Sequence, residues 1–414
     1  MILNNSIKKK IQTAVTLALI SSGIIPAVKA EVADQSVNNS SGTTIDQGLG
    51  TVAVDLDNGS TFTIDNAGTI SASASQNNMY GIQIDSANTT VSSLINTGTI
   101  LGETTATNKD TGYGIYAHSG GSIGTLTNSG TIKGRGRRNI GRGILTSNAS
   151  LTSFTNSSTG IIEAITGDGL GGGINACCAE GVSLNGPTSN SMDIDNDGII
   201  RALSDAGAAW GMRNTQKIGT LDNSGTILGQ ADDSGARGAE FEGSGSGYTI
   251  GTINNSGTMS GVAGVNNAYG LILKSRETGT INNSGIINAT ATSQNSYGVK
   301  IESQGTDITV ENFNNTGTIS ASSGTTLSYG VYLYNYYSDV TITNFTNTGT
   351  ISSSVGSGSN VYDIETSNGW GGNNIITNLN NSQGKDGNDV LTYKGKLPTN
   401  YNVIVNSTSD YGQI

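Results

Sequence analysis

A short phrase recurs along the chain at an interval of about 31 residues. It consists of an apolar residue, one variable residue, Asn, a small residue and then Gly-Thr-Ile, and it first spans Ile64 to Ile70. Its glycine falls at Gly68, Gly98, Gly130, Gly160, Gly198, Gly225, Gly257, Gly285, Gly317 and Gly349. The gaps between these glycines range from 27 to 38 residues. Self-similarity at this period is typical of a solenoid, in which each repeat stacks on the next, and argues against a compact globule.

A second phrase accompanies the first. About 13 residues after most repeat glycines comes another glycine, usually preceded by an aromatic residue, as in Trp210-Gly211 and Tyr329-Gly330. Apolar and polar residues then alternate, for example in Val299-Lys300-Ile301-Glu302, which predicts a half-buried strand. The segments on either side of the repeat glycine are two further strand candidates. We therefore expect about three strands of roughly three to five residues in each repeat, joined by Gly, Ser and Asn.

The fold class that follows is all-β: a single-stranded parallel β-helix of about ten coils of roughly 31 residues. At about 4.8 Å per coil, ten coils make a rod of roughly 50 Å. The isoleucines of the phrase are expected to stack into an internal ladder, namely Ile70, Ile100, Ile132, Ile227 and Ile319. The asparagine before each small-Gly pair is expected to form a polar ladder at a turn. Glycine in that turn is expected to supply a positive φ.

Composition agrees with a solenoid. Only 12% of the residues are charged and only 3 are proline, which argues against a disordered chain. The hydrophobic share of 34% is low for a globular core of 414 residues but sufficient for a narrow apolar stripe.

The chain begins like a secreted protein. Lys8, Lys9 and Lys10 precede an apolar stretch from Ile11 to Ile25, so residues 1–30 are predicted to be a signal peptide cleaved after Ala30. All 31 acidic and 16 of the 20 basic residues follow it, which leaves a formal charge of −15. An acidic surface of this kind argues against nucleic acid as a partner. The remaining chain is divided into an N-terminal cap (31–60), the repeats (61–380), with a lateral insertion at about 174–191, and a C-terminal junction segment (381–414).

Repeats of the Asn-x-Gly-Thr-Ile type behind a secretion signal resemble the passenger regions of bacterial autotransporters. The copies at 281–287 and 345–351 carry the resemblance best, and the tail from Leu397 to Gln413 resembles segments between passenger and barrel. The resemblance implies secretion to the periplasm, export through the outer membrane of a Gram-negative cell by a C-terminal β-barrel, and display at the cell surface. The sequence shows no barrel pattern of many alternating strands. A truncated passenger, a translocator encoded by a second gene and another release route are the alternatives.

One pattern suggests a metal site. Asp193, Asp195 and Asp197, followed by Gly198, match the opening of a calcium loop, but Ser204 stands where its final acid belongs. Weak Ca²⁺ binding and an ordinary copy of the repeat are the two interpretations. No other cofactor is expected.

Two patterns suggest ligand contacts. The first is the basic run that contains Arg135, Arg137 and Arg138, which is either a site for acidic polysaccharide or lipid-linked phosphate, or a solvated loop.

The second pattern is the alternation of Tyr332, Tyr334 and Tyr336 with Val331 and Leu333, which predicts that the three tyrosines face outward. Such rings suit stacking on sugars or docking on a partner protein, and the alternative is packing on tyrosines of adjacent coils.

Nothing in the sequence indicates a catalytic centre. His118 is the only histidine, and Cys177 and Cys178 are adjacent to one another with no nucleophile motif nearby. We therefore expect a secreted, surface-displayed rod with a structural or adhesive role and no catalytic activity, whose partner is a host or bacterial surface protein or a glycan. One alternative is a polysaccharide lyase or hydrolase that uses Asp193, Asp195 and Asp197 with Arg201. The other is a self-associating passenger for cell–cell aggregation.

Overall fold

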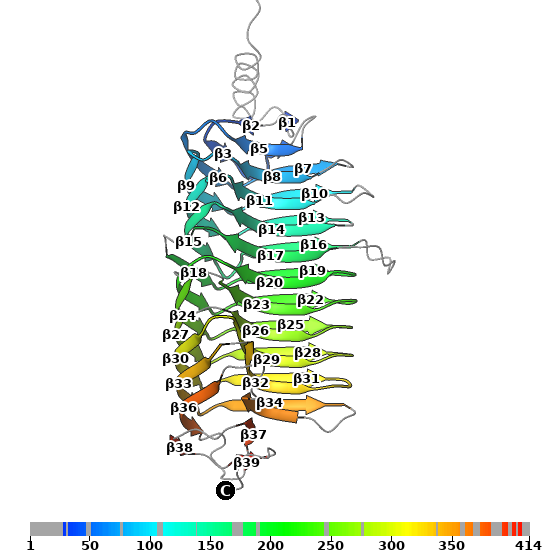
Figure 1. Ribbon diagram of the computed structural model, residues 1–414. Coiled ribbons are helices and arrows are strands. Elements are labelled where there is room, and N and C mark those ends of the chain that lie inside the picture. The colour runs from blue at the N-terminus through cyan, green and yellow to red at the C-terminus, as the bar shows by residue number, and fades with distance from the viewer. Residues whose placement is uncertain are drawn as a thin grey trace, which may run out of the picture.

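The chain winds into a rod built of three parallel β-sheets, which we name sheets A, B and C (Figure 1). The structure is a computed structural model, and it describes residues 28–29, 32–46, 51–74, 78–105, 111–137, 139–167, 177–187, 191–243, 248–274, 277–336, 338–356, 361–366, 373–381, 391–395, 400–402 and 405–407. Among these residues there is no helix, and neighbouring coils pair in parallel. The predicted all-β parallel solenoid is therefore confirmed.

Up to β36, successive strands of the chain enter the three sheets in turn, so every third strand belongs to the same sheet; β37 to β39 then alternate between sheets B and C. Within the described residues, sheet A has 12 strands: β1 (Val28–Lys29), β4 (Thr44–Asp46), β7 (Thr69–Ala74), β10 (Thr99–Thr104), β13 (Thr131–Gly136), β16 (Ile161–Thr166), β19 (Ile199–Ser204), β22 (Thr226–Ala231), β25 (Thr258–Ala263), β28 (Ile286–Ala291), β31 (Thr318–Ser323) and β34 (Thr350–Val355). Sheet B has 14: β2 (Val32–Ala33), β5 (Val52–Leu56), β8 (Met79–Ile84), β11 (Gly112–His118), β14 (Ile140–Ser147), β17 (Cys178–Asn185), β20 (Ala208–Asn214), β23 (Ala236–Glu242), β26 (Ala268–Lys274), β29 (Ser296–Gln304), β32 (Ser328–Tyr336), β35 (Val361–Thr366), β37 (Leu391–Gly395) and β39 (Val405–Ser407). Sheet C has 13: β3 (Val37–Asn39), β6 (Thr61–Asn66), β9 (Thr90–Asn96), β12 (Ser122–Asn128), β15 (Ser150–Asn156), β18 (Met192–Asn196), β21 (Ile218–Asn223), β24 (Thr249–Asn255), β27 (Glu277–Asn283), β30 (Ile308–Asn315), β33 (Val340–Asn347), β36 (Asn374–Asn381) and β38 (Asn400–Asn402).

The repeat phrase lies at the turn from sheet C to sheet A. Its asparagine ends a sheet C strand, its glycine makes the turn, and its Thr-Ile begins the sheet A strand, as in β6 and β7. The aromatic-Gly phrase lies in sheet B. Strands such as β29 and β32 have 9 residues, more than the three to five predicted, because the alternation continues further along each strand than the short motifs suggest.

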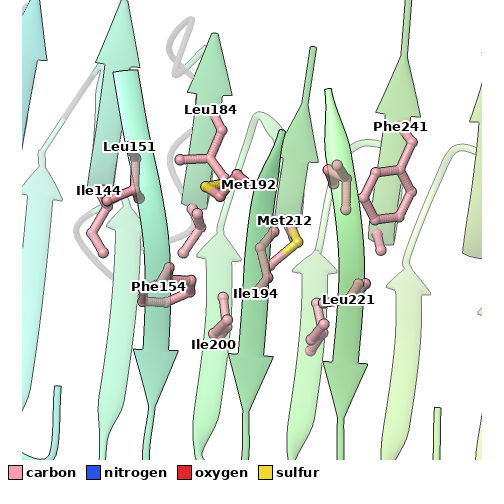
Figure 2. Close-up of a cluster of buried hydrophobic side chains, with 14 of the residues drawn as sticks. Ile144, Leu151, Phe154, Leu184, Met192, Ile194, Ile200, Met212, Leu221 and Phe241 are labelled. Carbon is pink, nitrogen blue, oxygen red and sulfur yellow. The ribbon is translucent and has the colours of Figure 1, made fainter. Parts of the chain in front are cut away.

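The core is a continuous apolar stripe enclosed by the three sheets. One side chain from each sheet A strand from β7 to β34 forms the predicted aliphatic ladder, and these are 0% exposed: Ile70, Ile100, Ile132, Ile162, Ile200, Ile227, Met259, Ile287, Ile319 and Ile351. Figure 2 shows a segment of this core, in which side chains from the three sheets, such as Ile144, Phe154 and Ile200, point toward one another. Burying each of these side chains contributes about 1.5–3 kcal/mol before the loss of conformational entropy is counted.

A buried ladder of amides runs beside the apolar core. In each coil the Nδ2 of an asparagine donates to the Oδ1 of the asparagine in the next coil, at 2.6–2.8 Å. The members are Asn39, Asn66, Asn96, Asn128, Asn156, Asn196, Asn223, Asn255, Asn283, Asn315, Asn347 and Asn381, all between 0% and 8% exposed. The predicted polar ladder is confirmed, and its bonds all point toward the C-terminal end. A buried amide is costly unless it is hydrogen-bonded, so each coil stabilises the one before it.

The repeat glycine is required for a different reason than predicted. The glycines of positive φ among the described residues are Gly42, Gly59, Gly120, Gly167 and Gly305, none of which belongs to the phrase. Instead, the backbones of successive turns touch. A Cβ on Gly285 would lie 2.1 Å from the carbonyl oxygen of Gly257, which no side chain can tolerate.

The expected domain boundaries need correction. The stretch 174–191 is not a lateral insertion over its middle part, because it contains β17, which pairs with β14 and β20 and buries Ala179, Val182 and Leu184. Residues 174–176 and 188–190 lie outside the described residues. Strands β2 to β5 in the expected cap, and β37 to β39 in the expected junction, belong to the same sheets. Of the predicted signal peptide, only 28–29 are described.

No helix long and apolar enough to span a membrane occurs in the described part of the chain.

Candidate functional site

The outer face of sheet B gathers most of the chemically distinctive side chains. In the described residues, every cation–π contact involves side chains of this sheet, and so does every ring–ring contact except that between Phe313 and Phe345 in the core. The aromatic-Gly phrase explains this placement. The glycine faces inward, where a Cβ on Gly298 would lie 2.7 Å from Cγ2 of Ile319, and the preceding aromatic residue therefore faces outward.

A column of tyrosines follows the rod axis near the C-terminal end of sheet B. Tyr297 stacks on Tyr269 with ring centroids 5.0 Å apart and on Tyr329 at 5.1 Å, with interplanar angles of 6° and 10°. The amides of Asn267 and Asn295 donate to the hydroxyls of Tyr269 and Tyr297. Burial raises the pKa of the Tyr297 and Tyr329 phenols above that of an exposed tyrosine. The rings present edges, and not faces, to an approaching ligand.

The predicted tyrosine row continues this column across β32. Val331 and Leu333 are buried, so the predicted outward orientation of Tyr332, Tyr334 and Tyr336 is confirmed. The rings contact one another, however, with centroids 5.9 Å apart between Tyr332 and Tyr334 and 6.5 Å apart between Tyr334 and Tyr336. Neighbouring rings therefore cover much of each face, and only Tyr336, at 42%, is well exposed. Ligand contact by this row stays a prediction.

Lys300 lies among these rings. Its Nζ is 5.0 Å from the centroid of Tyr334 and 5.5 Å from that of Tyr297, and it pairs with the carboxylate of Glu302 at 2.9 Å. Burial lowers the pKa of Lys300, and the Glu302 carboxylate offsets only part of that effect. The ammonium thus holds the tyrosine column and row together through cation–π attraction.

The middle of the same face carries a network of ion pairs. Glu240, only 2% exposed, accepts a hydrogen bond from the indole of Trp210 at 2.5 Å and pairs with Arg237 at 2.8 Å and Lys274 at 2.9 Å. Arg237 also lies over the Trp210 ring, 4.6 Å from its centroid. Burial alone would raise the pKa of Glu240, but Arg237 and Lys274 outweigh it, so the pKa is lowered. Glu240 is therefore held ionised and is poorly suited to act as a general acid.

The same network continues toward the N-terminal end. Glu180 accepts from Arg142 at 2.6 Å and lies 3.8 Å from Arg213. The sequence reasoning missed Glu180 and Glu240. Glu180-Gly181 occupies the aromatic-Gly slot, one coil after Arg142-Gly143, and aligning the repeats on that slot would have revealed the cross-coil pair.

The predicted basic cluster lies on sheet A, and its charges are largely paired. Arg135 binds Glu103 at 2.9 Å, and Lys133 binds Glu163 at 2.8 Å. Arg137 donates to the backbone carbonyl of Thr105 at 3.4 Å. Arg138 lies outside the described residues. Anion binding here stays a prediction, and the local carboxylates weaken the attraction on which it depends.

The carboxylates proposed for calcium lie on β18 and just after it. Asp193 and Asp195 face outward on this strand, where residues two apart are separated by roughly 6.6–6.8 Å, and Asp197 lies in the turn that follows. Asp193 accepts from the amide of Thr220 at 2.9 Å. Within the described ranges, no group of three or more His, Cys, Asp or Glu side chains has a metal-binding arrangement. Calcium binding by these three carboxylates stays a prediction, and the extended strand separates Asp193 from Asp195 more than a calcium loop would.

The remaining candidates for catalysis are dispersed. His118 stacks on Tyr116 with centroids 5.2 Å apart, and the Ser119 hydroxyl lies 2.6 Å from its Nδ1 and 2.9 Å from its Nε2. One hydroxyl close to both ring nitrogens is not the relay of a nucleophile, a base and an orienting acid. Cys177 and Cys178 are free thiols with sulfur atoms 2.6 Å apart, at the beginning of β17.

Comparisons of the chain with protein-family models, with curated proteins and with solved structures returned no match.

Proposed function

We propose that the chain is a secreted, surface-displayed rod of the autotransporter-passenger type, and that it adheres through the outer face of sheet B. The observation that carries this proposal is a contrast between the inward-facing and the outward-facing side chains of the rod. The interior repeats the same isoleucine and asparagine in nearly every coil, whereas one outward column of sheet B reads Arg142, Glu180, Trp210, Arg237 and Tyr269. Positions that face away from the apolar core carry the chemical variety that recognition needs.

A host or bacterial surface protein or a glycan is the partner that suits this face. Aromatic and arginine side chains are enriched at protein interfaces, and they supply most of the binding energy there. The formal charge of −15 after residue 30 opposes binding to nucleic acid. No metal or cofactor enters the proposal.

Adhesion is tested with beads coated with the purified protein and applied to epithelial cells, bacterial cells and a glycan array. We expect binding well above that of albumin-coated beads. Combining Arg213→Ala with Tyr336→Ala, both partly exposed on sheet B, should reduce it at least fivefold. The matched control combines Thr252→Ala with Asn282→Ala on the outer face of sheet C, and it should bind normally. If beads coated with the protein bound none of the three surfaces better than albumin-coated beads do, adhesion would be refuted.

The proposed export route is based on the predicted signal peptide and on the repeat phrase. Expression of the gene with its downstream DNA in a Gram-negative host should place the protein where protease added to intact cells removes it. A translocator barrel is the expected partner for this step. Protection from protease until the outer membrane is opened would contradict surface display.

The enzyme alternative finds no supporting geometry among the described residues. Glu180 and Glu240 are engaged by cations, and Asp193, Asp195 and Asp197 do not converge. Release of reducing or unsaturated sugars from pectin or alginate by the purified protein would restore that alternative.

Self-association is favoured by a different observation. On the outer face of sheet C, amides form an axial ladder, in which Asn282 donates to Asn254 at 2.8 Å and Asn314 to Asn282 at 2.9 Å. The amides of this ladder carry no charge, whereas Asp222, Glu277 and Glu311 are exposed elsewhere on the same face. The ladder is therefore the part of this face that lacks the charges that keep exposed sheets apart. Sedimentation velocity should show concentration-dependent dimers, which Asn314→Asp should weaken by like-charge repulsion. A monomer at all concentrations would exclude this alternative.

A further inference from the structure

Cys177 and Cys178 form a pair of neighbouring thiols that the proposed function does not use. They are the only 2 cysteines of the chain. Adjacent side chains within a strand point to opposite faces, but β17 begins at Cys178, so Cys177 lies outside this alternation. The two side chains approach one another, and their sulfur atoms lie 2.6 Å apart. Cys177 is exposed and Cys178 is partly buried, so a reagent in solution reaches the Cys177 sulfur more easily.

We infer that Cys177 and Cys178 form a reversible dithiol–disulfide couple, in which a low-molecular-weight disulfide such as oxidised glutathione joins their sulfur atoms into a vicinal disulfide. The Cys177 thiol loses its proton and attacks one glutathione sulfur, and the other glutathione leaves as a thiolate that takes up a proton. The Cys178 thiol then loses its proton and attacks the Cys177 sulfur, and the second glutathione leaves in the same way. Two protein thiols and one glutathione disulfide thus become one protein disulfide and two glutathione thiols, so the electrons and protons balance.

The surroundings of each sulfur assign its role. Glutathione must approach from solvent, and the exposed Cys177 thiol is the one that it meets first. Burial raises the pKa of the Cys178 thiol, and the neighbouring Cys177 adds to this effect, so little Cys178 thiolate is present to attack a molecule in solution. Once Cys177 carries glutathione, however, the Cys178 sulfur lies beside its target. The second step is therefore intramolecular, and proximity compensates for the low fraction of thiolate.

The vicinal disulfide is expected to be reduced easily, unlike a structural disulfide. Successive Cα atoms are about 3.8 Å apart, whereas the Cα atoms of ordinary disulfides are about 4.4–6.8 Å apart. The backbone around the pair is also anchored: the Cys177 amide donates to the Asn139 carbonyl at 3.1 Å, and the Ala208 amide donates to the Cys177 carbonyl at 3.1 Å. The Thr166 hydroxyl donates to the Cys178 carbonyl at 2.7 Å. These bonds resist the backbone rotation that ring closure requires, so the closed ring is strained and opens readily.

The couple is a property of the folded chain and does not depend on the proposed adhesion. Export, as proposed above, would bring the two thiols into an oxidising compartment, where disulfides form and persist. Because the test uses purified protein in solution, its failure would leave the adhesion proposal unaffected.

The test incubates the full, reduced chain with oxidised glutathione and follows its free thiols with a thiol-specific dye. We expect both of the 2 thiols to disappear, at a rate that does not depend on protein concentration, in protein that stays monomeric on non-reducing gels. Mass spectrometry of the peptide containing residues 177 and 178 should show the loss of two hydrogen atoms and no attached glutathione. Millimolar reduced glutathione should then restore both thiols, under conditions in which the structural disulfides of ribonuclease A persist.

Single serine variants separate the two roles. Cys178→Ser keeps the exposed thiol and should accumulate the mixed disulfide with glutathione, because no second thiol is present to displace it. Cys177→Ser keeps the partly buried thiol and should react with oxidised glutathione at least tenfold more slowly than Cys178→Ser. Circular dichroism establishes that both variants fold.

Five results would each overturn the inference. In the wild type these are two thiols that remain free in oxidised glutathione, a mixed disulfide that persists, disulfide-linked dimers, or a vicinal disulfide that resists reduced glutathione. The fifth is an equal rate of reaction in Cys177→Ser and Cys178→Ser.

Discussion

The amide ladder makes the sharpest prediction, because two adjacent asparagines face opposite sides of one strand. Asn255 is 2% exposed inside the rod, and Asn254 lies on the outer face of β24. Both take part in side-chain hydrogen bonds to neighbouring coils. Replacing each asparagine in turn by alanine therefore compares the loss of the same side chain in the buried interior and on the solvent-facing side of the strand.

The expected costs follow from the bonds that each residue makes. Asn255 accepts from Asn223 at 2.7 Å and donates to Asn283 at 2.7 Å. Asn255→Ala removes the donor to Oδ1 of Asn283 and one acceptor of the Asn223 amide, which keeps its bond to the Thr258 carbonyl at 3.3 Å. Each buried hydrogen-bonding site that loses its partner costs about 1–3 kcal/mol, so the loss should be about 2–6 kcal/mol. Asn254→Ala leaves groups that water can reach, so the loss should stay below about 1 kcal/mol.

Hydrogen exchange is the appropriate assay, because a solenoid unfolds coil by coil and a single unfolding free energy is poorly defined for it. In Asn255→Ala, amides of β21, β24 and β27 should exchange at least about 30-fold faster, which corresponds to about 2 kcal/mol. Coils far from the substitution should be unaffected. Equal exchange in the two variants would show that the ladder does not stabilise the rod and would refute the reasoning.

Three further predictions concern the turn, the core and the ion pairs. Gly285→Ala should destabilise its coil by about 1–3 kcal/mol or more, seen as a lower thermal midpoint, because its Cβ would collide with a backbone carbonyl. Phe313→Ala should cost about 3–5 kcal/mol in urea unfolding, because it removes a fully buried ring that stacks on Phe345 at 4.7 Å. Since the pKa of Glu240 is lowered in the folded state, its contribution to stability is present above about pH 4.5 and is lost as the pH falls through the lowered value. Glu240→Gln should therefore have a lower thermal midpoint than the wild type at pH 7, and the difference should narrow at pH 3; a constant difference would contradict this.

The inward-facing half of the fold could be predicted from the sequence. Ile100 and Ile132 occupy equivalent places in the phrase, and in a parallel stack equivalent places become neighbours, as their register confirms. Asn96 and Asn128 pair for the same reason. The alternation of Val331 and Leu333 with tyrosines likewise predicted which rings face outward. The period of the sequence was therefore sufficient to predict the position of a residue that has the same role in every coil.

The outward-facing half could not be predicted in the same way. The pairing of Arg142 with Glu180 joins residues 38 positions apart, across the longest gap in the repeat, and the irregular spacing hid the shared slot. Residues 31–60 were expected to form a cap, but Asn39 and Ile45 belong to an interrupted copy of the phrase that pairs with the next copy. Val54 and Leu56 face the same core. Stacking requires only an apolar inward side chain, so a coil can belong to the rod without matching the motif.

In each strand the inward-facing side chains hold the coils together, and the outward-facing side chains vary from coil to coil. This difference explains why such a scaffold suits recognition. The glycine turn and the asparagine ladder hold successive coils in register from inside, as the matched pairs on either side of β24 show. An outward substitution on sheet B then alters one coil and its two neighbours without disturbing the register, because stability is a sum of nearest-neighbour terms. Tyr269, Trp210 and Glu180 occupy the same column for that reason, although they share no chemistry. The chemistry of the outward face can therefore change coil by coil while the fold is preserved.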